Sequence, residues 1–141
     1  MSRHEALEAV DGFFLRIGQR FRHKMAGEPL TMAQFFVLRK LFSQGPMTMG
    51  ALADALGVSF AATTGIVDRL VQAQLVQRRR SEMDRRVVWV ELSPEGQEKM
   101  AAMRDERRRH LEELLKPLDD QELEELARLL QRVAEGVESR A

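Results

Sequence analysis

The sequence contains no cysteine, no tyrosine and one tryptophan among its 141 residues. The absence of cysteine excludes disulfides, thiol redox sensing and thiolate metal sites. No uncharged apolar run is long enough for a transmembrane helix, and charges between Arg3 and Glu8 interrupt any signal-peptide pattern. The three histidines, His4, His23 and His110, are too widely spaced to pair as metal ligands on one helix. These absences predict a cytoplasmic protein without a bound metal.

Catalytic signatures are also missing. The sequence offers no nucleophile paired with a base and no glycine-rich phosphate loop, so we do not expect an enzyme. A length of 141 residues fits one domain. The hydrophobic fraction of 44% and the charged fraction of 31% are typical of a soluble globular protein.

The formal net charge is zero, but the charges are unevenly distributed. Residues 69–86 contain six arginines and two acids, whereas residues 95–141 contain nine basic and thirteen acidic residues. A basic centre within an acidic frame favours a protein that presents one face to phosphates.

Long helices are predicted at both ends of the chain. Apolar residues recur at helical spacing over residues 7–25, and the run 27–29 ends that pattern. Near the C-terminus, Ser93 and Pro94 open one helix and Pro117 stops it. The last helix, capped by Asp119 or Asp120, carries apolar residues at intervals of three and four, and such a seam needs a partner helix. The seam consists of Leu123, Leu126, Leu130, Val133 and Val137.

The middle of the chain predicts three shorter helices. Thr31 and Gln34 form a capping box that opens the first, and Gly45–Pro46 ends it. After a brief extended link, two short helical patterns are separated by a tight turn at Gly57. Ser59 is placed to cap the second of them through its hydroxyl.

Beyond residue 74 the apolar period changes to two. Residues 75–80 and 86–92 predict paired strands, joined by the polar loop 81–85. Two helices around a tight turn, followed by a hairpin, make a helix-turn-helix with a wing. In such a motif the second helix enters the major groove of DNA, and arginines on the wing tip suit the minor groove.

Residues 52–96 resemble the DNA-binding core of the MarR family of winged helix-turn-helix transcriptional regulators. The matching pieces are Leu52–Ala53, Leu56–Ser59, Val67–Leu70, Leu75–Val76, Arg78, Asp84, Arg86, Val90, Leu92–Ser93 and Gly96. The resemblance implies a mainly α fold with a small β-wing, forming a single domain over residues 1–141. Residues 30–93 would form the winged-helix DNA-binding lobe, and residues 1–28 and 94–141 the dimerisation helices.

The resemblance also implies a function. It predicts a sequence-specific regulator that binds double-stranded DNA as a homodimer on a pseudo-palindromic operator. It further predicts that the regulator responds to a ligand. Repression is expected rather than activation, because occlusion of a promoter needs no contact with polymerase. An alternative from another class is a winged-helix module for protein–protein assembly, which would not bind specific DNA.

The candidate DNA contacts lie on the second helix of the motif and on the wing. They are Ser59, Ala61, Thr63, Thr64, Arg80, Asp84, Arg85 and Arg86. By resemblance, Asp84 would orient the wing, and Arg86, with Arg85 as a second candidate, would enter the minor groove. Both arginines also fit ordinary solvated charges paired with Glu82 and Asp84. The small residues of this helix leave its groove face thin, which favours readout of DNA shape and of thymine methyl groups. Helical periodicity also places Thr63 on the inward face.

Two further expectations concern an effector and a turn. Relatives bind small aromatic or phenolic ligands between their dimerisation helices and the DNA-binding lobe, which suggests a comparable pocket here. The candidate lining is Phe14, Phe21, Met25, Phe36 and Met103, although residues at this spacing also fit a plain core. Gln74 stands where the family usually has glycine, so a positive φ there would strain the backbone by roughly 1 kcal/mol.

Overall fold

The computed structural model describes residues 1–25 and 30–140, and the side chains of residues 1–20 and 30–140. Within those ranges the chain forms six helices and a three-stranded antiparallel sheet. The helices are α1 (Arg3–Met25), α2 (Met32–Gln44), α3 (Met49–Leu56), α4 (Phe60–Gln72), α5 (Pro94–Leu114) and α6 (Asp120–Glu138). The strands are β1 (Met47–Thr48), β2 (Val76–Arg80) and β3 (Val88–Leu92). This confirms the predicted mainly α fold with a small β-wing.

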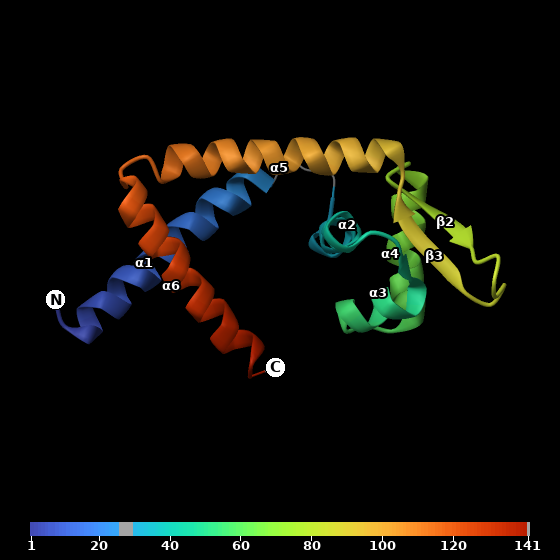
Figure 1. The fold of residues 1–141 in the computed structure, drawn as a ribbon, viewed down its shortest axis with the longest axis horizontal. Coiled ribbons are helices and arrows are strands. Elements are labelled where there is room, and N and C mark those ends of the chain that lie inside the picture. Colours follow the sequence, from blue (N-terminus) through green and yellow to red (C-terminus); the bar gives the residue numbers. More distant parts are fainter. Residues whose placement is uncertain (26–29, 141) are drawn as a thin grey trace.

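Helix α5 joins two dissimilar parts of the molecule (Figure 1). At its N-terminal end lie α2, α3, α4 and the sheet, which together form the winged lobe. Helices α1 and α6 lie outside that lobe: the N-terminal end of α1 points away from it, whereas α6 starts at the far end of α5 and turns back beneath it. Among the described residues, neither α1 nor α6 packs extensively against another element.

Among the described residues, the hydrophobic core lies in the winged lobe and in the part of α5 that packs on it. Val37, Leu38, Leu52, Val67 and Leu70 are fully buried. Full burial of one aliphatic side chain of this size contributes about 1.5–3 kcal/mol, so this cluster fixes α2, α3 and α4 relative to one another. The remaining members of the buried cluster are Leu41, Met49, Val76, Val90 and Met100, the last of which docks α5 onto the lobe.

Short polar side chains begin the helices where the sequence predicts them. The Thr31 hydroxyl accepts a hydrogen bond from the Gln34 amide at 3.1 Å, and the Gln34 side chain accepts one from the Thr31 amide at 3.0 Å. Asp119 and Glu122 form the same reciprocal pair at the start of α6, whereas Ser93 caps α5 through its hydroxyl alone, which accepts from the Gly96 amide. Each cap satisfies amide groups that have no partner inside the helix. The predicted capping box and helix starts are confirmed.

The sheet has the strand order β1–β3–β2. The predicted hairpin is present, but β3 begins at Val88 rather than at residue 86, so the connecting loop is two residues longer at that end. The extended link after α2 is a strand in its own right, because Met47 and Thr48 pair with Val90 and Trp89. This third strand ties the start of α3 to the wing.

The turn between α4 and β2 is held by its contact with α5. The Ser93 hydroxyl donates to the Gln74 carbonyl at 2.6 Å, and the Leu75 amide bonds the Leu70 carbonyl at 3.0 Å. Gly96 is needed for the close approach, since a Cβ there would lie 2.0 Å from the Leu75 carbonyl oxygen. Within this arrangement Gln74 has φ +64°, and it is the one non-glycine residue with positive φ in the described chain. The positive φ on which the strain at this position depends is therefore present.

Replacing Gln74 with glycine should therefore stabilise the protein. Removal of the left-handed strain is worth roughly 1 kcal/mol, which corresponds to a rise in Tm of about 3 °C for a chain of this size. Thermal unfolding monitored by circular dichroism measures the change. The matched control is Gln97→Gly within α5, which should lower stability by up to ~1 kcal/mol, since that backbone is helical. Equal effects of the two substitutions would contradict the strain at Gln74.

The apolar side chains of α1 and α6 are largely exposed. Leu7 and Phe14 on α1 expose 56% and 61% of their surface, and Leu130 and Val137 on α6 expose 53% and 66%. Such rows of large apolar side chains mark surfaces that another molecule covers.

No single described helix is long and apolar enough to cross a membrane; α3 and α4 pass that test only together, and they are bent by 107°.

Candidate DNA interface

The helix-turn-helix is formed by α3, a tight turn and α4. Gly57 ends α3 in the left-handed conformation, with φ 68° and ψ 28°, which glycine adopts without a steric penalty. Ser59 then caps α4, since its hydroxyl accepts from the Ala62 amide at 3.1 Å. The turn leaves the N-terminal end of α4 exposed, and the amides at such an end attract phosphate.

Three of the residues predicted to contact DNA through α4 share this end of the helix. Ser59 and Ala61 are exposed, and Thr64 is partly exposed. The Thr64 hydroxyl donates to the Phe60 carbonyl at 3.0 Å, so it does not project freely from the helix. These three residues are therefore accessible to a duplex that lies against the start of α4.

The prediction that Thr63 contacts DNA is wrong. Its side chain is completely buried, and its hydroxyl donates to the Ser59 carbonyl at 2.9 Å. That bond satisfies the only polar group of the side chain and directs its methyl group into the core. Thr63 therefore stabilises the first turn of α4, as its place on the inward face predicted.

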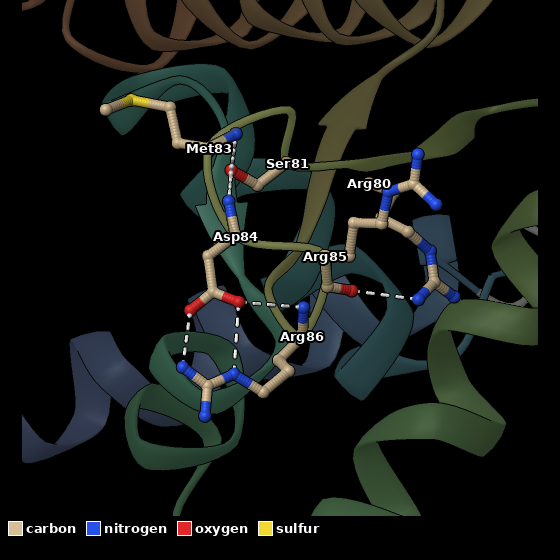
Figure 2. Close-up of polar contacts among 6 residues, drawn as sticks. All are labelled: Arg80, Ser81, Met83, Asp84, Arg85 and Arg86. Atoms are coloured by element: carbon tan, nitrogen blue, oxygen red, sulfur yellow. Dashed lines mark hydrogen bonds and ion pairs between the residues drawn. The ribbon is translucent and has the colours of Figure 1, made fainter.

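The wing tip holds one arginine in a fixed but open position (Figure 2). The Asp84 carboxylate accepts from Arg86 Nε at 3.1 Å, from its Nη2 at 3.2 Å and from its backbone amide at 3.1 Å. Hydrogen bonds from the Arg86 side chain and backbone lower the pKa of Asp84, so the carboxylate stays ionised to a lower pH than a free aspartate. The Arg86 side chain nevertheless remains 91% exposed. Asp84 thus orients a guanidinium group that is still available to an anion.

The rest of the loop is ordered by its own hydrogen bonds. The Ser81 hydroxyl accepts from the Met83 and Asp84 amides, both at 3.2 Å, and Arg80 donates to the Arg85 carbonyl at 2.8 Å (Figure 2). Within this loop the ion pair is formed by Asp84, and Glu82 takes no part in it. The loop is therefore organised before it meets a partner, which reduces the entropy lost on binding.

An ion pair that the sequence analysis did not identify links the wing to α4. Arg78 on β2 donates to the Asp68 carboxylate on α4. On the opposite side of the strand, Arg79 lies 3.6 Å from the Glu91 carboxylate. Arg78 and Arg79 are thus engaged within the lobe, whereas Arg85 and Arg86 face solvent. The link fixes the wing relative to α4, the two elements that would meet DNA.

Comparison with known proteins identifies the family. The sequence model of the MarR family matches residues 30–88. HTH-type transcriptional regulator YsmB of Bacillus subtilis (strain 168) is 31% identical over 107 residues, which are 76% of this chain and 73% of YsmB. The chain belongs to the MarR family. It is therefore a DNA-binding transcriptional regulator of the helix-turn-helix type and not an enzyme, as the resemblance implied.

Two further relatives extend the match beyond the winged lobe. HTH-type transcriptional repressor MdtR of the same bacterium is 28% identical over 131 residues, which are 93% of this chain and 84% of MdtR. The structure of Streptococcus pneumoniae FabT in complex with DNA is 16% identical and shares the fold, with a TM-score of 0.81 over 99% of this chain and 100% of FabT. The fold shared with FabT therefore includes α1, α5 and α6.

Three of the five residues predicted to line an effector pocket have described side chains in this MarR-family chain. A cavity of about 330 Å³ lies between α2, α4 and α5, with Gln34, Arg69 and Lys99 in its wall. It includes none of the described candidates, Phe14, Phe36 and Met103. Phe14 lies on α1, away from the winged lobe, and is 61% exposed. The side chains of the other two candidates, Phe21 and Met25, lie outside the described residues.

In the part of the chain that the structure describes, no three acidic or histidine side chains are placed to hold a metal ion.

Proposed function

We propose that this MarR-family regulator is a repressor that binds a pseudo-palindromic operator as a homodimer. One observation carries the proposal: the exposed start of α4 and the Asp84-held Arg86 belong to a single rigid lobe. A pair of such lobes would set two α4 helices in major grooves about one helical turn, ~34 Å, apart. Each wing would place Arg86 in a flanking minor groove, where narrow A·T-rich tracts have an enhanced negative potential.

The proposed contacts combine positioning and readout. Ser59, with the amides at the start of α4, suits a phosphate contact, and Ala61 lies beside it on the groove side. Thr64 would make such a contact by exchanging its hydrogen bond to the Phe60 carbonyl for one to a phosphate oxygen. Arg85 and Arg86 supply the charge of the wing, Asp84 orients Arg86, and Arg80 supports the loop. Residues 30–93 would thus form the DNA-binding lobe of the single domain.

The dimer is proposed from the apolar rows on the outer helices. Residues 1–28 and 94–141 would form the dimerisation region, because most of the described large apolar side chains of α1 and α6 are exposed in one chain. The repressor name of MdtR and the DNA complex of FabT support the same function here. A small aromatic or phenolic effector, if it binds one spacing of the two lobes better than another, would release the operator.

Selection of bound fragments from random duplex DNA tests the proposal. We expect two inverted half-sites whose centres lie about 10 base pairs apart. Binding should weaken with salt, with a log–log slope of about −0.9 per neutralised phosphate. Failure to enrich any sequence, together with no binding in dilute buffer, would favour a protein–protein assembly module.

A further inference from the structure

The exposed start of α4 is unusually apolar for a surface that faces DNA. The Phe60 side chain is 60% exposed, and Val58 in the preceding turn is 44% exposed. Ala61 and Ala62 are exposed beside them, and the first charged residue of the helix is Asp68. The first two turns of α4 therefore offer a duplex a surface of methyl groups and one aromatic ring.

The hydroxyl groups of this segment are engaged by its own backbone. The Ser59 hydroxyl accepts from the Ala62 amide at 3.1 Å, and the Thr64 hydroxyl donates to the Phe60 carbonyl at 3.0 Å. Thr63 is buried and bonded to Ser59. No side chain here has the arginine or lysine group that reads guanine, or the amide that reads adenine.

Only one apolar group is displayed in the major groove, the C5-methyl group of thymine. We propose that Phe60, flanked by Val58 and Ala61, packs against thymine methyl groups in each half-site and is a specificity-determining residue. This rests on the proposed function, which places α4 in the major groove. It assigns a role to Phe60, to which the sequence analysis gave none.

The inference agrees with the chemistry of the wing. Arg86 favours the narrow minor groove of A·T-rich DNA, which it recognises by charge. Phe60 favours thymine in the major groove, which it recognises by apolar contact. The two residues therefore select A·T pairs on different edges of the duplex by independent physical effects, and the Arg78–Asp68 pair fixes their separation.

The test uses the operator recovered from random DNA and the full-length protein. Each half-site thymine is replaced in turn by deoxyuridine, which removes the C5-methyl group alone. Loss of one buried methyl contact should weaken binding about fourfold, and loss of the symmetric pair about 16-fold. Substitutions outside the half-sites should have no effect.

The variant Phe60→Ala identifies the side chain responsible. Because Phe60 is exposed, the variant should fold normally, as circular dichroism will check. It should bind the thymine and uracil operators equally, at the affinity of the wild-type protein for the uracil operator. The control Met32→Ala removes another exposed apolar side chain, on α2, and should retain the discrimination.

Equal binding of the wild-type protein to thymine and uracil at every half-site position would overturn the inference but leave the repressor proposal intact. Continued discrimination by Phe60→Ala would overturn the role of Phe60. Recovery of no operator at all would instead overturn the proposed function and this inference with it.

Discussion

Replacing Arg86 with alanine is expected to weaken operator binding by about 100-fold. Each of the two wings in a dimer would lose a contact worth roughly tenfold. The slope of log affinity against log salt should also become less steep by about one unit for each arginine removed. Fluorescence anisotropy with a labelled operator at several salt concentrations measures both quantities.

The geometry of the loop explains why Arg86 should matter more than its neighbours. Its guanidinium group donates two hydrogen bonds to one carboxylate, and the side chain is still 91% exposed. Its rotamer is therefore restricted before binding, and less conformational entropy is lost when it enters the groove. In Asp84→Asn the charge that holds Arg86 is removed while the size is kept, so an intermediate loss of affinity is expected.

Arg85→Ala is the matched control. Arg85 has the same charge and directly precedes Arg86 in the chain. Its contribution to the order of the loop comes from its backbone carbonyl, which accepts a hydrogen bond from Arg80 and is kept in the alanine variant. Its removal should weaken binding by less than tenfold. Equal losses for the two variants would mean that the wing acts as diffuse positive charge, and unchanged binding by Arg86→Ala would refute its role.

Local chemistry explains which parts of the fold were predictable. The caps at Thr31, Ser59 and Ser93 and the left-handed turn at Gly57 depend on residues within one turn of each other, so the sequence alone determines them. The family's glycine indicated that Gln74 would be strained if its φ were positive, and it is. Each of these features follows from a local rule of hydrogen bonding or backbone sterics.

Contacts between distant residues were the part that could not be predicted. Arg78 and Asp68 are ten residues apart, and their ion pair depends on how β2 lies across α4. Thr63 had two possible assignments, because periodicity placed it inward and resemblance placed it at DNA; the packing of the lobe decided for the core. The cavity between α2, α4 and α5 is lined by neither Phe14, Phe36 nor Met103, because spacing along single helices does not determine which elements enclose a cavity.

Replacing Leu130 with glutamate is expected to convert the proposed dimer to a monomer. Leu130 lies in the apolar seam of α6 and is 53% exposed in the single chain. A carboxylate buried against a partner helix without a cation would carry a large desolvation penalty. The monomer would contact one half-site only, so operator affinity should fall by about 1,000-fold through loss of bivalent binding. Light scattering after size exclusion measures the mass, and anisotropy measures the affinity.

The neighbouring substitution Gln131→Glu adds the same charge beside the seam and should preserve both the dimer and its affinity. Because the core lies in the winged lobe, Leu130→Glu should retain its helical circular dichroism, which separates dissociation from unfolding. The half-site affinity should also remain, since α4 and the wing are unchanged. A Leu130→Glu protein that stays dimeric would show that the α6 seam lies outside the interface. A monomer with full operator affinity would contradict the two-site arrangement on which the spacing of the half-sites depends.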